Sequence, residues 1–213
     1  MAIHIAKEAK KAGAMQFIQM STIAVYGNVN SINLYSPENP AGVYGETKLA
    51  ADRALMTLHD KTFMVSIIRP PMVYGNGNAP GNMMRLIKFA QKGLPMPFKG
   101  IKNKRDFIHV LNLVNVLTVV IENKKDNIIL PTDKKAVSTS DIVNLVKINS
   151  INAVRQIRVP GFLLAIGKRF FPSIYFKLFG SLEVECSLSE DIYQPRYTIE
   201  EGIIEMISFL RHS

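Results

Sequence analysis

The sequence is poor in cysteine and in acidic residues, and its segment richest in Phe, Leu and Ile, at 159–179, is interrupted by charges and a proline. The single cysteine, Cys186, excludes an intramolecular disulfide framework and a zinc site built from several cysteines. A reducing cytoplasm is therefore the expected compartment, and no metal site is expected. Lysines interrupt residues 1–15, so no signal peptide is predicted. With 13 Gly and 11 Pro among 213 residues, the chain is neither collagen-like nor of low complexity.

Acidic residues are outnumbered, since 26 Lys and Arg face 17 Asp and Glu and give a formal charge of +9. Such a charge attracts nucleic acid, anionic membranes and phosphorylated small molecules. The basic residues occur as scattered pairs, with a denser cluster only at 102–105. No alternation of aromatic and basic residues and no zinc-finger spacing accompanies them. We therefore expect a basic solvated surface and no nucleic-acid partner.

Apolar periodicity predicts alternating helices and strands. Apolar runs at 16–20 and 63–68 are predicted strands, and the helical pattern at 46–58 between them completes one crossover unit of a parallel sheet. Further helices are expected at 3–12, 83–91, 111–122, 141–148 (capped by Ser138), 162–178 (broken by Pro172) and 199–210 (capped by Thr198). Further strands are expected at 106–110, 127–130 and 157–159, and loops at 21–40 and 75–81.

Tyr44 and Lys48 stand four residues apart at the start of a predicted helix. Their side chains therefore share one helix face, a single turn apart. An ammonium group close to a phenol favours the phenolate, which can take a proton from a sugar hydroxyl or return it. This spacing alone is common on solvated helices, so the surrounding motifs decide its meaning.

Five further motifs accompany this pair in a fixed order. They are Ser21-Thr22-Ile23-Ala24-Val25-Tyr26-Gly27, Arg69-Pro70-Pro71-Met72-Val73-Tyr74-Gly75, Gly81-Asn82, Pro97-Phe98 and Lys104-Arg105-Asp106-Phe107-Ile108-His109-Val110. The set resembles the extended short-chain dehydrogenases/reductases of the NAD-dependent epimerase/dehydratase family. Nucleotide-sugar 4-epimerases, such as those acting on UDP-glucose and UDP-N-acetylglucosamine, are the most similar members, and residues 180–202 resemble their closing segment.

The resemblance implies an α/β fold: an incomplete Rossmann-type parallel sheet with a small C-terminal substrate-binding α/β subdomain. Residues 1–75 would form the C-terminal part of the NAD-binding domain. Residues 76–213 would form mostly the substrate-binding subdomain, with some segments returning to the Rossmann core. The implied activity is C4 epimerisation of a UDP-hexose or UDP-N-acetylhexosamine through a transient 4-keto sugar, in polysaccharide biosynthesis.

The resemblance also implies the catalytic roles. Tyr44 would exchange the proton of the sugar 4-hydroxyl, and Thr22 would hydrogen-bond the 4-oxygen. Lys48 would favour the phenolate and hold the nicotinamide ribose. Ser21 and Pro71 would join Tyr44 and Lys48 in binding NAD. The cofactor carries the chemistry, and the protein positions it.

Substrate contacts are implied farther along the chain. Asn82 begins a predicted helix, where N–H groups favour a diphosphate. Arg105 offers a guanidinium fork for phosphate oxygens, and Phe98 offers a ring for uracil. In this pattern His109 is expected to be structural.

The chain departs from the family pattern in three places. Ile23 and Ala24 stand where the dehydratases carry an acidic pair, so 4,6-dehydration is not expected. Met72 stands where some epimerases place an asparagine against the substrate, so the motif does not predict which sugar is bound. No Gly-x-x-Gly-x-x-Gly turn precedes Gly13, and the cluster at 75–81 is one residue too long, with Pro80 where glycine is needed.

Aligned by its motifs, the sequence starts in the helix before the active-site strand. About 100 residues, the first half of a dinucleotide fold, would precede it in the family. We expect either a truncated or split gene product or a chain whose missing part is supplied by a partner, with a homodimer as the other candidate assembly. The parallel strands left behind would expose an unpaired sheet edge. Alone, it should bind NAD poorly and turn over weakly.

Three alternatives stay open at this point. The chain is a catalytically inactive fragment that binds sugar nucleotides, or it is a reductase of 4-keto nucleotide sugars with the same Thr/Tyr/Lys set. The third concerns residues 159–179, rich in Phe, Leu and Ile. Because Lys168, Arg169 and Pro172 interrupt them, they cannot span a bilayer. They form either helices of the substrate subdomain, the interpretation we favour, or a peripheral membrane contact.

Overall fold

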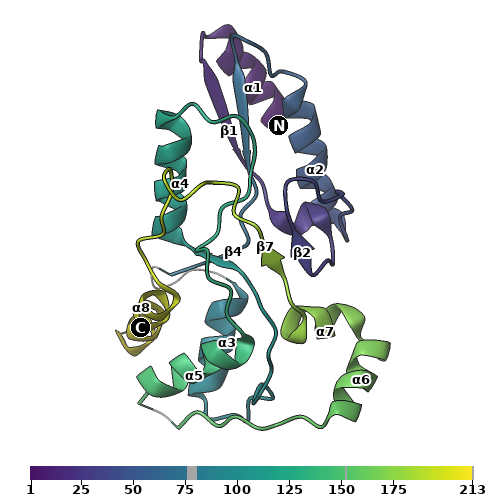
Figure 1. The fold of residues 1–213 in the computed structure, drawn as a ribbon, viewed down its shortest axis with the longest axis vertical. Coiled ribbons are helices and arrows are strands. Elements are labelled where there is room, and N and C mark those ends of the chain that lie inside the picture. The colour runs from purple at the N-terminus through teal and green to yellow at the C-terminus, as the bar shows by residue number, and fades with distance from the viewer. Residues whose placement is uncertain (76–80, 152, 213) are drawn as a thin grey trace. The chain divides into compact units, whose positions relative to one another are not determined.

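The computed structural model describes residues 1–75, 81–151 and 153–212 and divides the chain into two compact units. Unit 1 comprises Met1–Pro71, Leu113–Thr132 and Val184–Gln194, and unit 2 comprises Met72–Asn112, Asp133–Glu183 and Pro195–Ser213. The chain thus passes from one unit to the other several times (Figure 1). Apart from its two terminal glycines, the loop predicted at 75–81 lies outside the described residues.

Unit 1 is built on a parallel sheet of three strands. These are β1 (Gln16–Met20), β3 (Met64–Ile68) and β6 (Asn127–Ile129), in the order β1-β3-β6. Helix α2 (Val43–Met56) connects β1 to β3, which confirms the predicted crossover unit. Within the described part of the chain, β1 is an edge strand that pairs with β3 alone.

Helices cover both faces of this sheet. Helices α1 (Ala2–Lys11) and α2 lie on one side of the strands, and α4 (Val110–Glu122) lies on the other (Figure 1). Under α1 and α2, apolar side chains of both layers form one core, made of Ala6, Leu55, Phe63, Val65 and Ile67. A parallel sheet needs this two-sided cover, because both of its faces are apolar. The unit is therefore part of a Rossmann-type α/β fold.

The segment at 21–40 is more ordered than the predicted loop. It contains a 3-10 helix, η1 (Ile23–Tyr26), and a short strand, β2 (Ser31–Ile32), which pairs with β7 (Glu183–Val184). The hydroxyl of Thr22 caps η1 by accepting from Ala24 N at 3.2 Å. Elements this short carry no periodic pattern, which is why the sequence did not show them.

Unit 2 packs three helices and a pair of parallel strands around a second core. The strands are β4 (Met72–Tyr74) and β5 (Phe107–His109), and the helices are α3 (Asn82–Gln91), α5 (Thr139–Asn149) and α8 (Ile199–His212). The core includes Ile87, Val143 and Ile203, one fully buried residue from each helix. The predicted capping box of Ser138 and Asp141 is confirmed.

Two predictions for unit 2 need correction. Residues 157–159 form no strand: the pairing there is an isolated bridge between Gln156 and Met96, followed by one hydrogen bond from Lys99 N to the Ile157 carbonyl at 3.2 Å. Strand β4 was not predicted, since it is three residues long and directly follows two prolines.

The broken helix is confirmed as α6 (Gly161–Phe170) and α7 (Pro172–Phe179), with Pro172 as the first residue of α7. No helix among the described residues is long and apolar enough to cross a membrane.

Helix α8 lies close to strands β4 and β5 at Gly202. A Cβ atom there would lie 2.4 Å from the Tyr74 ring and 2.8 Å from the His109 ring. Helix propensity alone predicts that Gly202→Ala stabilises the protein by about 1 kcal/mol. We expect the opposite sign, a loss of about 1–3 kcal/mol in unfolding free energy measured with urea, because both rings are buried.

Gly161→Ala is the matched control, because Gly161 is also helical and nothing lies within 4 Å of its Cβ position. It should be neutral or slightly stabilising. A Gly202→Ala variant as stable as this control would show that α8 does not press on the two rings.

Candidate active site

One face of α2 carries Tyr44, Lys48 and Asp52 at intervals of four residues. This face meets the carboxyl end of β1. Lys48 Nζ donates to the carbonyl oxygen of Met20 at 2.9 Å, and Ser21 Oγ donates to Asp52 Oδ2 at 2.7 Å. Along the face, burial falls from Asp52, which is 1% exposed, to Tyr44, which is 62% exposed. The phenol is therefore open to a ligand while its helix is fixed at the sheet.

Gly45 lets α2 approach η1 closely. A Cβ atom at this position would lie 2.7 Å from the carbonyl oxygen of Ala24. The segment that begins with Thr22 therefore packs against the first turn of α2. The structure thus brings Thr22, Tyr44 and Lys48 to the carboxyl edge of the parallel sheet, where α/β folds bind their ligands.

A buried arginine joins the segments that carry these residues. The Arg69 side chain, which directly follows β3, is 2% exposed. Its Nε donates to Asp52 Oδ2 at 3.0 Å, its Nη1 to Tyr26 Oη at 2.9 Å and its Nη2 to Glu38 Oε1. Strand β3, helix α2, η1 and the loop after β2 are therefore held by one guanidinium group. Its planar fork suits three separate acceptors.

The two carboxylates of this network have opposite pKa shifts. Burial raises the pKa of Asp52, and the hydrogen bond from Ser21 and the charge of Arg69 offset this only in part. Burial also opposes ionisation of Glu38, but hydrogen bonds and charges from Arg69 and Arg53 outweigh it and lower the pKa of Glu38. Glu38 therefore supplies the negative charge that the buried guanidinium needs.

The other two predicted cofactor residues are not exposed. The Ser21 hydroxyl is bound to Asp52, and Ser21 itself is 7% exposed. Pro71 is buried just before β4. Of the four predicted cofactor residues, Tyr44 and Lys48 are therefore the ones whose side chains lie accessible at the sheet edge. The sequence contains no glycine-rich turn of the kind that binds a dinucleotide diphosphate.

Unit 2 brings the three predicted substrate residues together. Asn82 from the start of α3, Phe98 and Arg105 line one pocket, together with Met72 and Lys177. Phe98 is only 3% exposed and packs on Phe179, with ring centroids 5.5 Å apart, so most of its ring lies in the core. The pocket is mainly apolar, with cationic side chains in its lining.

Arg105 has no carboxylate partner among the residues that the structure describes. Its Nη1 donates to the carbonyl oxygens of Phe176 at 3.1 Å and Gly180 at 2.9 Å. Burial lowers the pKa of Arg105, because the pocket withdraws its charge from water. A cation compensated only by carbonyl dipoles favours an anionic ligand.

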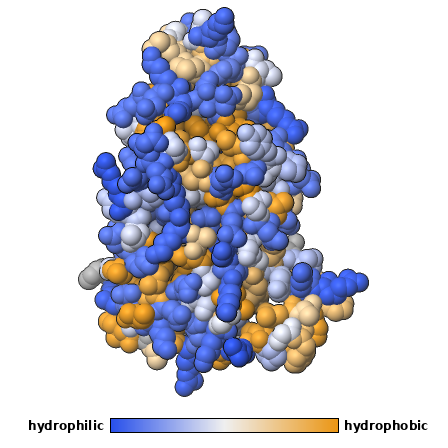
Figure 2. Space-filling view, viewed as in Figure 1, coloured by the Kyte–Doolittle hydropathy of each residue, from blue (hydrophilic) through white to orange (hydrophobic). Residues whose placement is uncertain are grey.

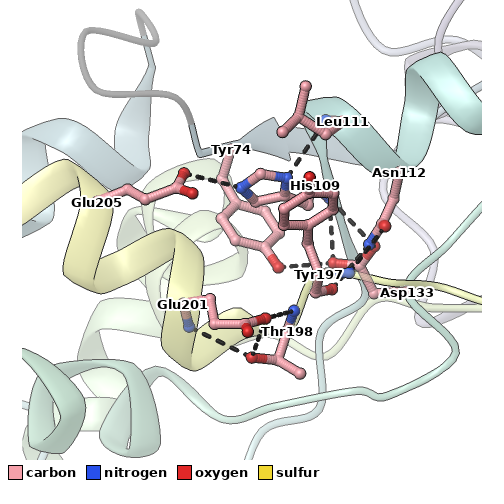
Figure 3. A network of polar contacts seen from close by, with 9 residues as sticks. All are labelled: Tyr74, His109, Leu111, Asn112, Asp133, Tyr197, Thr198, Glu201 and Glu205. Atoms are coloured by element: carbon pink, nitrogen blue, oxygen red, sulfur yellow. Dashed lines mark hydrogen bonds and ion pairs between the residues drawn. The ribbon is translucent and has the colours of Figure 1, made fainter.

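His109 belongs to a structural network in unit 2 (Figure 3). Its ring is fully buried: Nδ1 accepts from Leu111 N at 3.2 Å, and Nε2 lies 3.2 Å from Glu205 Oε2. The ring also stacks on Tyr197, with centroids 4.9 Å apart. Both ring nitrogens therefore have partners, as expected of a structural histidine.

Asp133 is the acceptor at the centre of this network. It accepts hydrogen bonds from Tyr74 Oη, Asn112 Nδ2 and the backbone of His109 (Figure 3). Burial raises the pKa of Asp133, although these donors offset part of the effect. The strands β4 and β5 are thereby tied to the segment that begins at Asp133.

Sequence reasoning missed Glu38, Asp52, Arg69 and Lys177. Asp52 carried a signal, since it continues the spacing of Tyr44 and Lys48 by one turn. The partners of Arg69 come from distant segments and carried no local signal. No cluster of three or more potential metal ligands occurs in the described ranges.

Glu38→Gln tests the charge balance around Arg69. Because the folded-state pKa of Glu38 is lowered, its contribution is present at neutral pH and is lost as the pH falls through that folded-state value. We expect the variant to lose about 1 kcal/mol of unfolding free energy at neutral pH. This loss should shrink when urea titrations are continued to pH values below about 4, the ordinary range of a glutamate. The exposed Glu8→Gln is the control, and a pH-independent loss in Glu38→Gln would contradict the assignment.

Two sequence comparisons with known proteins point to one family. The model of the "NAD dependent epimerase/dehydratase family" matches residues 1–130. UDP-glucose 4-epimerase from Vibrio cholerae is 32% identical over 94% of this chain, which spans 64% of that relative's length.

Solved structures share the fold. UDP-glucuronic acid 4-epimerase from Bacillus cereus, in complex with NAD, has a TM-score of 0.76 at 19% identity, over 99% of this chain and 66% of that one. The UDP-Glc/GlcNAc 4-epimerase from Campylobacter jejuni has a TM-score of 0.74 at 18% identity, over 100% and 69%. The chain is therefore a member of the NAD-dependent epimerase/dehydratase family.

Proposed function

We propose that this chain carries the catalytic and substrate-binding residues of an NAD-dependent nucleotide-sugar epimerase that inverts C4 of a UDP-hexose or UDP-N-acetylhexosamine. The observation that carries the proposal is the face of α2, which fixes Lys48 at the carboxyl end of β1 and leaves Tyr44 exposed. The segment that begins at Thr22 packs against the same turn of α2, at Gly45. NAD, when bound, supplies the redox chemistry at the sugar C4. The relatives named above support this activity, since their names are those of UDP-sugar 4-epimerases.

Tyr44 moves the proton in this proposal. Its Oη takes the proton of the sugar 4-hydroxyl and later returns it. Lys48 Nζ is held by the Met20 carbonyl at 2.9 Å, one helical turn along α2 from Tyr44, so it provides a cation at a fixed position near the proposed base. Tyr44 and Lys48 would also hold the nicotinamide ribose.

Thr22 orients the reacting oxygen. Because Thr22 Oγ1 already accepts from Ala24 N, its O–H is directed away from that bond and donates to the sugar 4-oxygen. An acid and a base for dehydration are lacking here, since Ile23 and Ala24 follow Thr22. The proposed reaction is therefore inversion at C4 without dehydration.

The substrate diphosphate would bind in the pocket of unit 2. Arg105 and Lys177 supply the positive charge, and Asn82 supplies the N-terminus of α3. Stacking of uracil on Phe98 stays a prediction. We assign unit 1 to the NAD-binding domain and unit 2 to the substrate-binding subdomain.

Substitution of the proposed base tests the chemistry. With NAD and UDP-glucose supplied, we expect Tyr44→Phe to lower kcat by about 100-fold or more, because the proton of the 4-hydroxyl has no acceptor. Tyr35→Phe, at a tyrosine that is 94% exposed, is the matched control. NMR of the sugar anomeric protons measures the turnover, and equal kcat values in the two variants would contradict the role of Tyr44.

Lys177→Met tests the anion site separately from catalysis. We expect the Kd for UDP, measured by isothermal titration calorimetry, to rise about 10-fold, the equivalent of one charge-assisted hydrogen bond. Lys147→Met, in the exposed last turn of α5, should leave the Kd unchanged.

A parallel NAD titration separates the enzyme from its alternatives. Binding of UDP without NAD would favour a sugar-nucleotide-binding fragment. Consumption of NAD(P)H in place of retained NAD would favour a 4-keto reductase.

A further inference from the structure

Helices α6 and α7 form a hairpin whose large apolar side chains face solvent. No residue of α6 is buried. The exposed fractions are 65% for Phe162, 48% for Ile166 and 68% for Phe170, and these residues follow one another at intervals of four. Such spacing places them on one stripe of the helix. A soluble helix usually turns this stripe toward the protein core.

The second helix repeats the pattern. Phe171, Ile174 and Leu178 are 62%, 57% and 39% exposed, at intervals of three and four residues. The two helices pack on each other through different residues, since the Cβ position of Gly167 lies 3.9 Å from Cδ2 of the Tyr175 ring. Figure 2 shows hydrophobic side chains gathered where Figure 1 places α6 and α7, with hydrophilic ones beside them.

The charged residues in the stretch of sequence that contains the hairpin are all basic. Between Asp141 and Glu183 the sequence has no acidic residue, but it has six basic ones: Lys147, Arg155, Arg158, Lys168, Arg169 and Lys177. Lys168 and Arg169 are exposed in the last turn of α6 and directly precede Phe170 and Phe171. Apolar side chains flanked by lysine and arginine are the composition of helices that lie in the surface of an anionic bilayer.

This charge also decides between the candidate occupants. A second copy docked symmetrically on the hairpin would bring the same cations of both copies together, which is unfavourable. A soluble anion would satisfy the cations but would leave the phenylalanine rings in water. A bilayer surface, with anionic headgroups over an apolar layer, satisfies both.

We propose that the α6–α7 hairpin is a peripheral binding surface for anionic membranes. The rings of Phe162, Phe170 and Phe171 enter the boundary between headgroups and acyl chains, and Lys168 and Arg169 bind lipid phosphates. The five side chains that carry this proposal do not line the substrate pocket, although Lys177 and Leu178 at the end of α7 do. The proposed membrane contact therefore does not involve Tyr44 or the predicted substrate residues. From the sequence we favoured helices packed within the substrate subdomain. The exposure of the apolar side chains of α6 and α7 instead favours the alternative, a peripheral membrane contact.

Vesicle sedimentation with the full chain tests the proposal. We expect binding to vesicles of 70% phosphatidylcholine and 30% phosphatidylglycerol, and little binding to pure phosphatidylcholine. Reversal of two charges in Lys168→Glu/Arg169→Glu should lower the partition coefficient by about 20-fold or more, because each basic residue near an anionic surface contributes about fivefold. High salt should weaken binding of the unmodified chain.

A second double variant measures the contribution of the apolar side chains to vesicle binding. Phe162→Ser/Phe170→Ser should lower binding by a comparable factor. The matched controls are Lys7→Glu/Lys88→Glu for charge and Phe89→Ser/Ile121→Ser for apolar exposure, at residues that are exposed elsewhere on the chain. Circular dichroism and thermal melting verify that each variant is folded.

Three results would overturn the proposal. One is sedimentation that does not depend on phosphatidylglycerol. Another is equal loss of binding in the control variants. The third is self-association or poly(U) binding that disappears in Phe162→Ser/Phe170→Ser while vesicles are not bound, which would assign the hairpin to a second copy or to RNA.

Discussion

The burial of the Arg69 guanidinium is the constraint on which the candidate catalytic site depends. A buried charge without partners costs several kcal/mol, so the fold must supply acceptors from every side. It does so with Asp52 from α2, Tyr26 from η1 and Glu38 from the loop after β2. Because the same helix carries Tyr44 two turns before Asp52, fixing the arginine also fixes the reactive phenol.

The two units divide the chemistry between them. Unit 1 holds the groups that would move a proton, and unit 2 holds a pocket in which a poorly compensated Arg105 favours an anion. The two tasks need different environments. Proton transfer needs an accessible group on a rigid helix, whereas binding of a diphosphate needs a cation partly withdrawn from water.

Much of the fold was predictable because its elements are periodic. The strand at Gln16–Met20, the crossover through α2 and the capping box at Ser138 follow from local patterns, and all are present. The failures are the short elements. Strand β4 is three residues long, and the expected strand at 157–159 is a single bridge, because pairing over so few residues is decided by neighbours and not by composition.

The sequence by itself determined the family, the order of the elements and the pair Tyr44 and Lys48, because motif spacing and helical period are local properties. Only the tertiary structure decided what surrounds each side chain. It placed the Ser21 hydroxyl on Asp52, engaged both ring nitrogens of His109, and left the phenylalanines of α6 exposed. Burial and partnership depend on contacts between residues far apart in the chain, which no local pattern records.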